Sequence, residues 1–405
     1  MKIAIFTDIY APWGSGGIAS SVRAQKAELE KLGHEVTLFC PGEKAREKGV
    51  VTVPSHRRVR ISGAIVAKRP KVVEEYVLEK FPDFASFDVV HVHYEASCSI
   101  AGVRLAKKFN LPLVQTQHGR EDVAIAVNMP HPIKLLTAVT LNTAHGRCLP
   151  HEIRVRRDKY QAPTWTRAQM WNLVVNHAEQ ADIVITPSRH FAQKIEHYGV
   201  TRPIVVVSNG IPEGLIDTDF PVRELTDGGV LKIVWNCRVS KEKRIMPLLE
   251  ALKDLKRPYV LHIYGNGNTL RRAKSYAERN RLKVKFYGET DRAKIVKRMA
   301  EAHLSATVSY NFDVQPMTLL EAEATGLPVF FCDPVMREVV TPGGYVLADG
   351  PEAAALRMAL ENIGAEDIAR MSKKMLAGRE RVRQSRQAEK LLAVYRQAIK
   401  MHEKA

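Results

Sequence analysis

Short apolar runs alternate with amphipathic segments along most of this chain. The first run, 2–7, is followed by a stretch rich in proline and glycine and then by a segment with helical periodicity. The apolar residues of that segment fall on one helical face: Ile18, Val22, Leu29 and Leu32. Gly33 stands where a helix C-terminal cap belongs, and another apolar run follows at once. This order predicts the start of a doubly wound parallel sheet.

The alternation continues and then restarts in the second half of the chain. Further runs are short and rich in β-branched residues, as expected of parallel strands buried on both faces: 89–93, 112–116, 183–186 and 204–207. After the polar stretch 213–229, a new strand, helix and strand are predicted at 231–235, 246–255 and 259–264. We therefore predict an α/β protein of two doubly wound, Rossmann-like parallel-sheet domains, 1–220 and 221–385.

The end of the chain has helical periodicity and no predicted strand. Residues 386–405 carry an apolar stripe: Leu391, Leu392, Val394, Tyr395 and Ile399. A stripe of this kind needs an apolar surface to pack on. We predict that this last helix crosses back to the first domain.

Between 129 and 175 the periodicity is poorer, and basic and aromatic residues interleave: His131, Lys134, Arg147, Arg154, Arg156, Arg157, Lys159, Tyr160, Trp165, Arg167 and Trp171. The commoner interpretation of such a cluster is a solvated surface. The functional interpretation is attachment to an anionic membrane surface, where each basic residue contributes about 1 kcal/mol.

Lys and Arg total 61 against 44 Asp and Glu, and the formal charge of +17 favours anionic partners. Nucleic acid is not expected, because no zinc-finger spacing, RNA-recognition strand or basic region joined to heptads is present. The N-terminus lacks the pattern of a secretory signal, and no apolar run reaches the roughly 18 residues of a membrane span. We expect a cytoplasmic protein, peripheral at the inner face of the cell membrane if the lipid interpretation holds. The five scattered cysteines predict neither a disulfide framework nor a zinc site.

Two loops that follow predicted strands carry groups suited to phosphate. Gly16 and Gly17 allow a close approach to the backbone where a helix begins, although Ala19 breaks the dinucleotide fingerprint. Arg238 and Lys243 follow the first strand of the second domain. Cations at the mouth of a sheet can neutralise a diphosphate and assist its departure.

The segment 311–329 carries the strongest candidate chemistry. Asp313 precedes a helix predicted to begin near Met317, and Glu321 lies within that helix. The two carboxylates and the N–H groups between them, around Gln315 and Thr318, are placed to hold sugar hydroxyls, a ribose diol and a diphosphate together.

This set, in this order with the turn Gly265–Gly267, resembles the retaining GT-B glycosyltransferases of family 4, and the likeness covers nearly the whole chain. The resemblance implies a GT-B fold, whose two domains face across a cleft. The segment 6–12 and the pair Glu121 and Asp122 resemble the branch that glucosylates diacylglycerol or related lipids. The family usually has Glu where this chain has Asp313, and commonly Gly where it has Pro316.

The resemblance implies a role for each candidate. Gly16 and Gly17 would lie against the donor diphosphate, and His118 would contact the donor sugar. Arg238 and Lys243 would hold the phosphates, with Gly265, Gly267, Gln315, Met317 and Thr318 on the donor side. Glu321 would bind the ribose, and Asp313 the hydroxyls of the transferred sugar. His118, Arg238, Lys243 and Asp313 form the expected catalytic set.

The resemblance further implies retaining, front-face transfer from a UDP- or GDP-sugar, with no cofactor and no metal. His91 and His93 are interpreted as pointing to opposite faces of a strand and so as sharing no metal. A membrane lipid or lipid-linked glycan is the expected acceptor. The alternatives are a soluble acceptor, or a non-catalytic nucleotide-sugar binder, which Asp313 and Pro316 make conceivable. An NAD-dependent oxidoreductase is disfavoured, and base, sugar and oligomeric state stay open.

Overall fold

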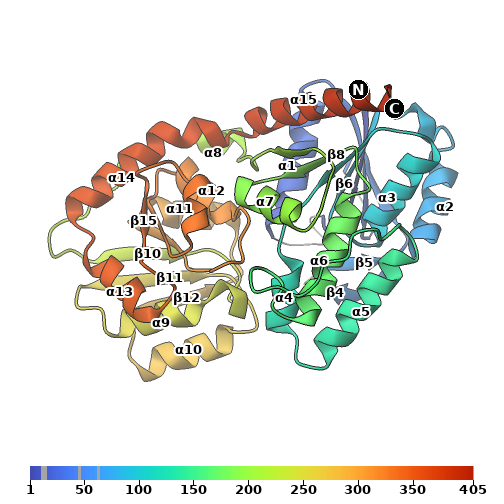
Figure 1. Cartoon of the computed structure of the whole chain (residues 1–405). Helices are drawn as coiled ribbons and strands as arrows, with labels where there is room; N and C mark the ends of the chain where they lie inside the picture. The colour runs from blue at the N-terminus through green and yellow to red at the C-terminus, as the bar shows by residue number, and fades with distance from the viewer. Residues whose placement is uncertain (11–15, 44–46, 62–63, 405) are drawn as a thin grey trace. The chain divides into compact units, whose positions relative to one another are not determined.

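The computed structural model describes residues 1–10, 16–43, 47–61 and 64–404, without the side chains of 57–59 and 61. The chain forms two units, shown in Figure 1: Met1–Gly210 together with Gln384–Ala405, and Ile211–Arg383. The sequence pattern placed these boundaries at 220 and 385. The structure has the first about ten residues earlier and the second two residues earlier.

Unit 1 is built on a seven-stranded parallel sheet in the order β3-β2-β1-β6-β7-β8-β9. Its strands are β1 (Lys2–Thr7), β2 (Glu35–Pro41), β3 (Val50–Val53), β6 (Val89–His93), β7 (Leu113–Thr116), β8 (Ile183–Thr186) and β9 (Ile204–Val206). An antiparallel hairpin, β4 (Ser55–Ile61) with β5 (Ala64–Ala67), was not predicted from the sequence. Its helices are α1 (Gly17–Lys31), α2 (Pro70–Lys80), α3 (Ser97–Lys108), α4 (Glu121–Asn128), α5 (Ile133–Gly146), α6 (Trp165–Ala178), α7 (Arg189–His197) and α15 (Gln384–His402).

Strand β1 shows why its sequence forms a buried strand. Ile3 and Ile5 belong to a core shared with α1, which contributes Val22 and Leu29. On the other face Phe6 stacks on Phe39 of β2, with ring centroids 4.5 Å apart. Because both faces are covered, the strand is a continuous apolar run and not an alternating one.

Helix α15 belongs to unit 1, although unit 2 separates it from the rest of that unit in sequence. Leu391, Leu392, Val394 and Tyr395 are buried in the same core as Ile3 and Ile5 of β1. Tyr395 Oη also lies 2.8 Å from Nδ1 of His91 within the buried sheet. The apolar stripe of the last helix therefore packs on the sheet of the first domain.

The expectation for His91 and His93 was wrong. Residues i and i+2 of a strand share a face, and the two rings lie 4.0 Å apart between centroids. His91 Nε2 lies 2.7 Å from Thr116 Oγ1, while His93 Nδ1 lies 2.8 Å from His118 Nε2. The two histidines form part of a buried polar row.

Unit 2 has a six-stranded parallel sheet in the order β12-β11-β10-β13-β14-β15. Its strands are β10 (Leu231–Trp235), β11 (Tyr259–Tyr264), β12 (Val284–Gly288), β13 (Leu304–Thr307), β14 (Val329–Phe331) and β15 (Tyr345–Leu347). Its helices are α8 (Glu213–Ile216), α9 (Ile245–Lys253), α10 (Leu270–Arg279), α11 (Arg292–Ala300), α12 (Met317–Ala324), α13 (Ala353–Glu361) and α14 (Ala365–Gly378). Ile233 and Trp235 of β10 enter one core and Val234 enters another, so this sheet is also covered on both faces. The predicted fold class, two doubly wound parallel-sheet domains, is confirmed.

All five cysteines are free. Within the described ranges, none of the helices has the length and apolar character needed to cross a bilayer.

We predict that Leu391→Ala lowers the free energy of unfolding by about 2–5 kcal/mol, because it leaves a cavity between α15 and the sheet. Lys390→Ala, one residue earlier and exposed, is the matched control and is expected to change stability by less than about 0.5 kcal/mol. Urea unfolding of both variants measures this. Equal effects of the two substitutions would show that α15 does not stabilise unit 1.

Candidate functional site

Both sheets have a point where the strand order reverses, and ligands of doubly wound sheets bind beyond the carboxyl ends of strands at such a point. In unit 1 the reversal lies between β1 and β6, and in unit 2 between β10 and β13. The loop after β10 holds Arg238 and Lys243, and the loop after β13 holds Asp313. The topology therefore brings the predicted cations and acid of unit 2 to one edge of its sheet.

Lys243 and Asp313 form a direct ion pair across this edge. Lys243 Nζ lies 2.5 Å from Asp313 Oδ1, and both side chains are about nine-tenths buried. Burial on its own lowers the pKa of Lys243, but the Asp313 carboxylate outweighs this effect and raises it. Phe312 adds a cation–π contact, with Nζ 5.2 Å from the ring centroid. Lys243 is thus a fixed, fully charged cation.

The backbone holds both partners of this pair in place. Lys243 ends a short 3₁₀ turn, and Arg244 then adopts a left-handed conformation, with φ 61°, before α9 begins. On the other loop Asn311, with φ 50°, donates its N–H to Asp333 Oδ2 at 2.6 Å. Ser309 Oγ donates to the second oxygen of Asp313. The carboxylate is therefore oriented before any ligand arrives.

Glu321 lies on α12 beside the same loop. Asn236, just after β10, donates from Nδ2 to Oε2 at 3.1 Å, and Arg292 Nη2 of α11 lies 3.2 Å from Oε1. Burial raises the pKa of Glu321, and Arg292 acts in the opposite direction. Glu321 is one residue of a three-residue polar group that combines acceptor oxygens with donor nitrogens.

Arg238 is more exposed than Lys243. Its side chain is 56% exposed, and Nη2 lies 3.5 Å from Oε1 of the buried Glu242. Ser240 Oγ donates to the same oxygen at 2.5 Å. Because the Arg238 guanidinium is half-exposed, some of its N–H groups can be reached by a ligand that binds from solvent.

The glycines at 265 and 267 shape the loop that carries the cations. A Cβ on Gly265 would lie 2.4 Å from the carbonyl oxygen of Cys237, and one on Gly267 would lie 2.3 Å from that of Val239. Gly265 also has φ 131°, which L side chains rarely adopt. In the structure these glycines permit close packing of two loops, and their contact with a donor stays a prediction.

The start of α12 holds the remaining predicted donor residues. Helix α12 begins at Met317 as predicted, with Pro316 at the N-cap position. Thr318 Oγ1 lies 3.4 Å from Thr307 Oγ1 at the end of β13. Gln315, Met317 and Thr318 are all half-buried. Proline removes one N–H from this end of the helix, so fewer backbone donors are available there.

In unit 1 the edge beside β1 and β6 carries a second polar group. Gly16, with φ 101°, precedes α1, which begins at Gly17; Gly14 and Ser15 of the same predicted loop lie outside the described residues. The buried Asp8 accepts N–H groups of Cys98 and Ser99 at 2.8 and 3.1 Å, at the start of α3. Glu95, just after β6, is buried as well.

His118 follows β7 in this group, half-buried and bonded to His93. Burial lowers its pKa to about 4, so the ring is neutral and can donate one hydrogen bond. Burial, followed by the charges of Glu121 and Asp8, raises the pKa of Glu95 well above its usual range. Unit 1 therefore offers neutral hydrogen-bonding groups, whereas unit 2 offers fixed charges.

Sequence reasoning missed several polar residues at these edges. They are Asp8, Glu95, Asn236, Arg292 and Ser309. Each stands alone in sequence, without a partner at a recognisable spacing. Position within two residues of the end of a predicted strand was the available signal for Asp8, Glu95 and Asn236.

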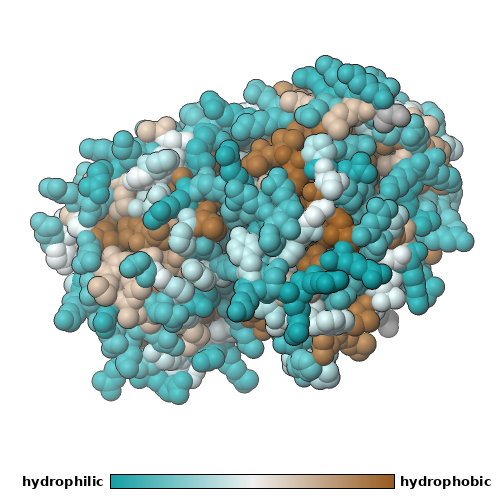
Figure 2. All heavy atoms as spheres, viewed as in Figure 1, coloured by the Kyte–Doolittle hydropathy of each residue, from teal (hydrophilic) through white to brown (hydrophobic). Residues whose placement is uncertain are grey.

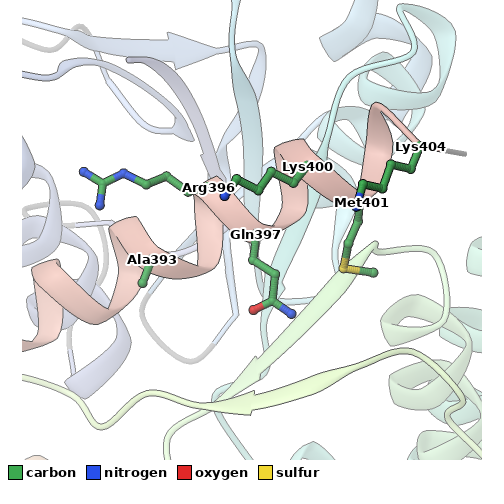
Figure 3. A pocket seen from close by; sticks show the side chains of 6 residues that line it. All are labelled: Ala393, Arg396, Gln397, Lys400, Met401 and Lys404. Atoms are coloured by element: carbon green, nitrogen blue, oxygen red, sulfur yellow. The ribbon is translucent and has the colours of Figure 1, made fainter.

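A surface depression in unit 1 lies elsewhere. Its lining comes from α15 and the turn that follows it, as Figure 3 shows: Ala393, Arg396, Gln397, Lys400, Met401 and Lys404. His402 of the same helix donates from Nε2 to the carbonyl of Asn110, which precedes β7, at 3.0 Å. The depression is therefore beside the amino ends of the strands, at the edge opposite His118.

Comparison with known proteins gives two family matches. Residues 15–214 match Glycosyltransferase Family 4, and residues 220–377 match Glycosyl transferases group 1. The chain is similar to alpha-monoglucosyldiacylglycerol synthase of Streptococcus pneumoniae, 25% identical over 81% of this chain and 70% of that protein. It is also similar to lipopolysaccharide 1,6-galactosyltransferase of Escherichia coli K12, 23% identical over 67% of this chain and 75% of that protein.

Solved structures share the fold. The structure of HepE from Anabaena in complex with UDP-glucose has a TM-score of 0.69 at 15% identity, covering 97% of this chain and 99% of that chain. At this identity the likeness establishes the fold alone. It agrees with the pair of doubly wound sheets described above.

The buried histidines predict a loss of stability in acid. Burial lowers the pKa of His91 to about 3, while unfolded histidine titrates near 6.5. Below about pH 6.5 the histidine binds a proton in the unfolded chain but stays neutral in the folded chain. The free energy of unfolding therefore falls as the pH falls. For His91 this lowers the free energy of unfolding at about pH 5 by about 2 kcal/mol relative to its value at about pH 7.5.

His91→Gln removes one of these titrations, so the difference in unfolding free energy between the two pH values should shrink by about 2 kcal/mol. Urea unfolding at both pH values measures it, with the exposed His131→Gln as the control. A pH difference that is the same in wild type and His91→Gln would contradict the assignment of a neutral buried ring.

Proposed function

We propose that this chain, which belongs to the GT-B glycosyltransferases of family 4, transfers a hexose with retention from a nucleotide-diphosphate sugar to a membrane lipid or lipid-linked glycan. Glycosyl transfer from a nucleotide sugar follows from the family, and the retaining course and the acceptor are the proposal. The Lys243–Asp313 ion pair at the switch point of the unit 2 sheet is the observation that carries it.

In the proposed reaction Lys243 binds the donor diphosphate. Nucleoside diphosphate gains negative charge as the bond to the sugar breaks, and a fixed cation in a poorly solvated site stabilises that charge. Arg238, anchored by Glu242 but half-exposed, supplies a second cation. The donor phosphates would compete with Asp313 for Lys243, which frees a carboxylate oxygen to accept a hydroxyl of the transferred sugar.

Glu321 is proposed to bind the ribose diol. A carboxylate that accepts two hydroxyl hydrogen bonds recognises a diol well, and charged acceptors make the stronger hydrogen bonds. Asn236 and Arg292 fix the orientation of Glu321. In unit 1 the neutral His118 is proposed to donate to a sugar hydroxyl, with Gly16 and Gly17 against the diphosphate.

We propose that Lys243 and Arg238 stabilise the departing diphosphate without a metal or cofactor. The departing diphosphate would itself accept the proton of the acceptor hydroxyl, on the same face of the sugar. Retention follows from that front-face geometry. The printed names of the relatives, a glucosyldiacylglycerol synthase and a lipopolysaccharide galactosyltransferase, support a lipid or lipid-linked acceptor.

Lys243→Ala is expected to lower kcat/KM for transfer by about 100-fold or more, because it removes a charge that is needed most in the transition state. Lys241→Ala, on the same turn but exposed, is the control and should keep activity within a few-fold. Thermal unfolding of both variants shows whether the fold is retained. Near-normal turnover of a folded Lys243→Ala would refute the proposed role.

Glu321→Ala is expected to weaken donor binding by about 10- to 100-fold through loss of charged hydrogen bonds to the ribose. A thermal-shift screen against UDP-, GDP- and ADP-sugars identifies the donor first, since a ligand at about 100 times its Kd stabilises by about 2.7 kcal/mol. Isothermal titration with that donor then compares Glu321→Ala with wild type. An unchanged Kd would exclude Glu321 from the donor site.

A further inference from the structure

Helix α5 buries Ala138 and His145, while several of its large apolar side chains are exposed. Asn142 Nδ2 donates to Gln169 of α6 at 2.5 Å, and His145 is buried. By contrast, Leu136 is 69% exposed and Ile133 is 54% exposed. A surface helix normally has the opposite distribution, with its apolar stripe against the core.

A chain of three histidines fixes this orientation. His145 Nδ1 lies 2.6 Å from His151 Nε2, and His145 Nε2 lies 2.8 Å from His177 Nδ1 of α6. Burial, followed by the neighbouring rings, lowers the pKa of His145 well below its usual range, so the chain is neutral. Rotation of α5 to hide its apolar stripe would break these bonds.

Exposed apolar residues lie at the starts of α5 and α6. Asn142 bonds Gln169 and His145 bonds His177, so α5 and α6 run in the same direction and begin at the same end. The exposed apolar side chains of α4, α5 and α6 are Val127, Ile133, Leu136, Val139, Leu141 and Trp165. Figure 2 shows hydrophobic spheres gathered at the lower end of unit 1, where Figure 1 draws the start of α5. We call Ile133, Leu136 and Trp165, which lie near the starts of α5 and α6, the α5 surface.

The sequence segment that carries α5 has charged residues of one sign. The sequence has no acidic residue between Asp122 and Glu152, while Lys134 and Arg147 lie at the two ends of α5. An apolar stripe bordered by cations, with tryptophan at its edge, fits the interface of an anionic bilayer. A second protein copy would meet the same positive charge and would be repelled.

We propose that the α5 surface inserts into the headgroup region of an anionic membrane and holds the enzyme there. This inference rests on the proposed function, because it identifies the surface by which the enzyme reaches a lipid acceptor. Leu136, Ile133 and Trp165 enter the apolar boundary, and Lys134 contacts lipid phosphates. The basic loop of Arg154, Arg156 and Arg157 adds long-range attraction.

The test is flotation of the full chain with vesicles of phosphatidylcholine alone or mixed with phosphatidylglycerol. Ile133→Ser with Leu136→Ser is expected to weaken partitioning to the mixed vesicles by about tenfold or more, and Lys134→Ala to remove part of the preference for anionic lipid. Met358→Ser, which alters an equally exposed residue of unit 2, is the matched control and should bind as wild type does. Leu136→Phe should also preserve binding.

Transfer to a short-chain acceptor in solution separates this inference from the proposed function. The double variant should keep that activity while losing flotation. If the wild type floats, the double variant does not, and the wild type transfers no sugar, the proposed function is wrong but the membrane-binding role of the α5 surface is supported. The inference would be overturned if the double variant floated as the wild type does, or if Met358→Ser lost as much flotation as the double variant. It would also be overturned if the double substitution broke a dimer without any effect on flotation.

Discussion

Both faces of each parallel sheet are buried, and this limits where polar functional groups can lie in the chain. A polar group inside such a sheet must find a partner within the protein, as His91 does with Thr116 and Tyr395. Polar groups on the loops beyond the carboxyl ends of the strands can pair with one another, and the reversal of strand order opens space between these loops for a ligand. The Lys243–Asp313 pair and the Glu321 group both depend on this constraint.

The two edges differ in how they hold charge. In unit 2, Lys243 keeps its proton because Asp313 compensates for burial. In unit 1 burial keeps His118 neutral, and the raised pKa of Glu95 has the same cause. Fixed charges suit a diphosphate, whose charge changes during transfer, whereas neutral donors and acceptors suit sugar hydroxyls. The charge state of each of these groups thus follows from the local balance of burial and charge.

Much of the fold could be predicted because buried strands are continuous apolar runs. The strands predicted at 2–7, 89–93, 231–235 and 259–264 have those bounds in the structure, and the helix with Glu321 begins at Met317. Helix α5 could not be found this way, because periodicity analysis assumes that apolar residues face inward. The partners Asn236 and Arg292 were missed because single polar residues acquire meaning only when the chain folds. The face shared by His91 and His93 was misassigned, although strand periodicity alone decides it.

This chain is expected to turn over, and not merely to bind, a nucleotide sugar. The most direct measurement is release of nucleoside diphosphate from the donor with and without a diacylglycerol-type acceptor. The account predicts release that depends on the acceptor and matches the glycolipid formed mole for mole. Tight donor binding with no acceptor-dependent release, across lipid and soluble acceptors, would contradict it and identify a nucleotide-sugar-binding protein.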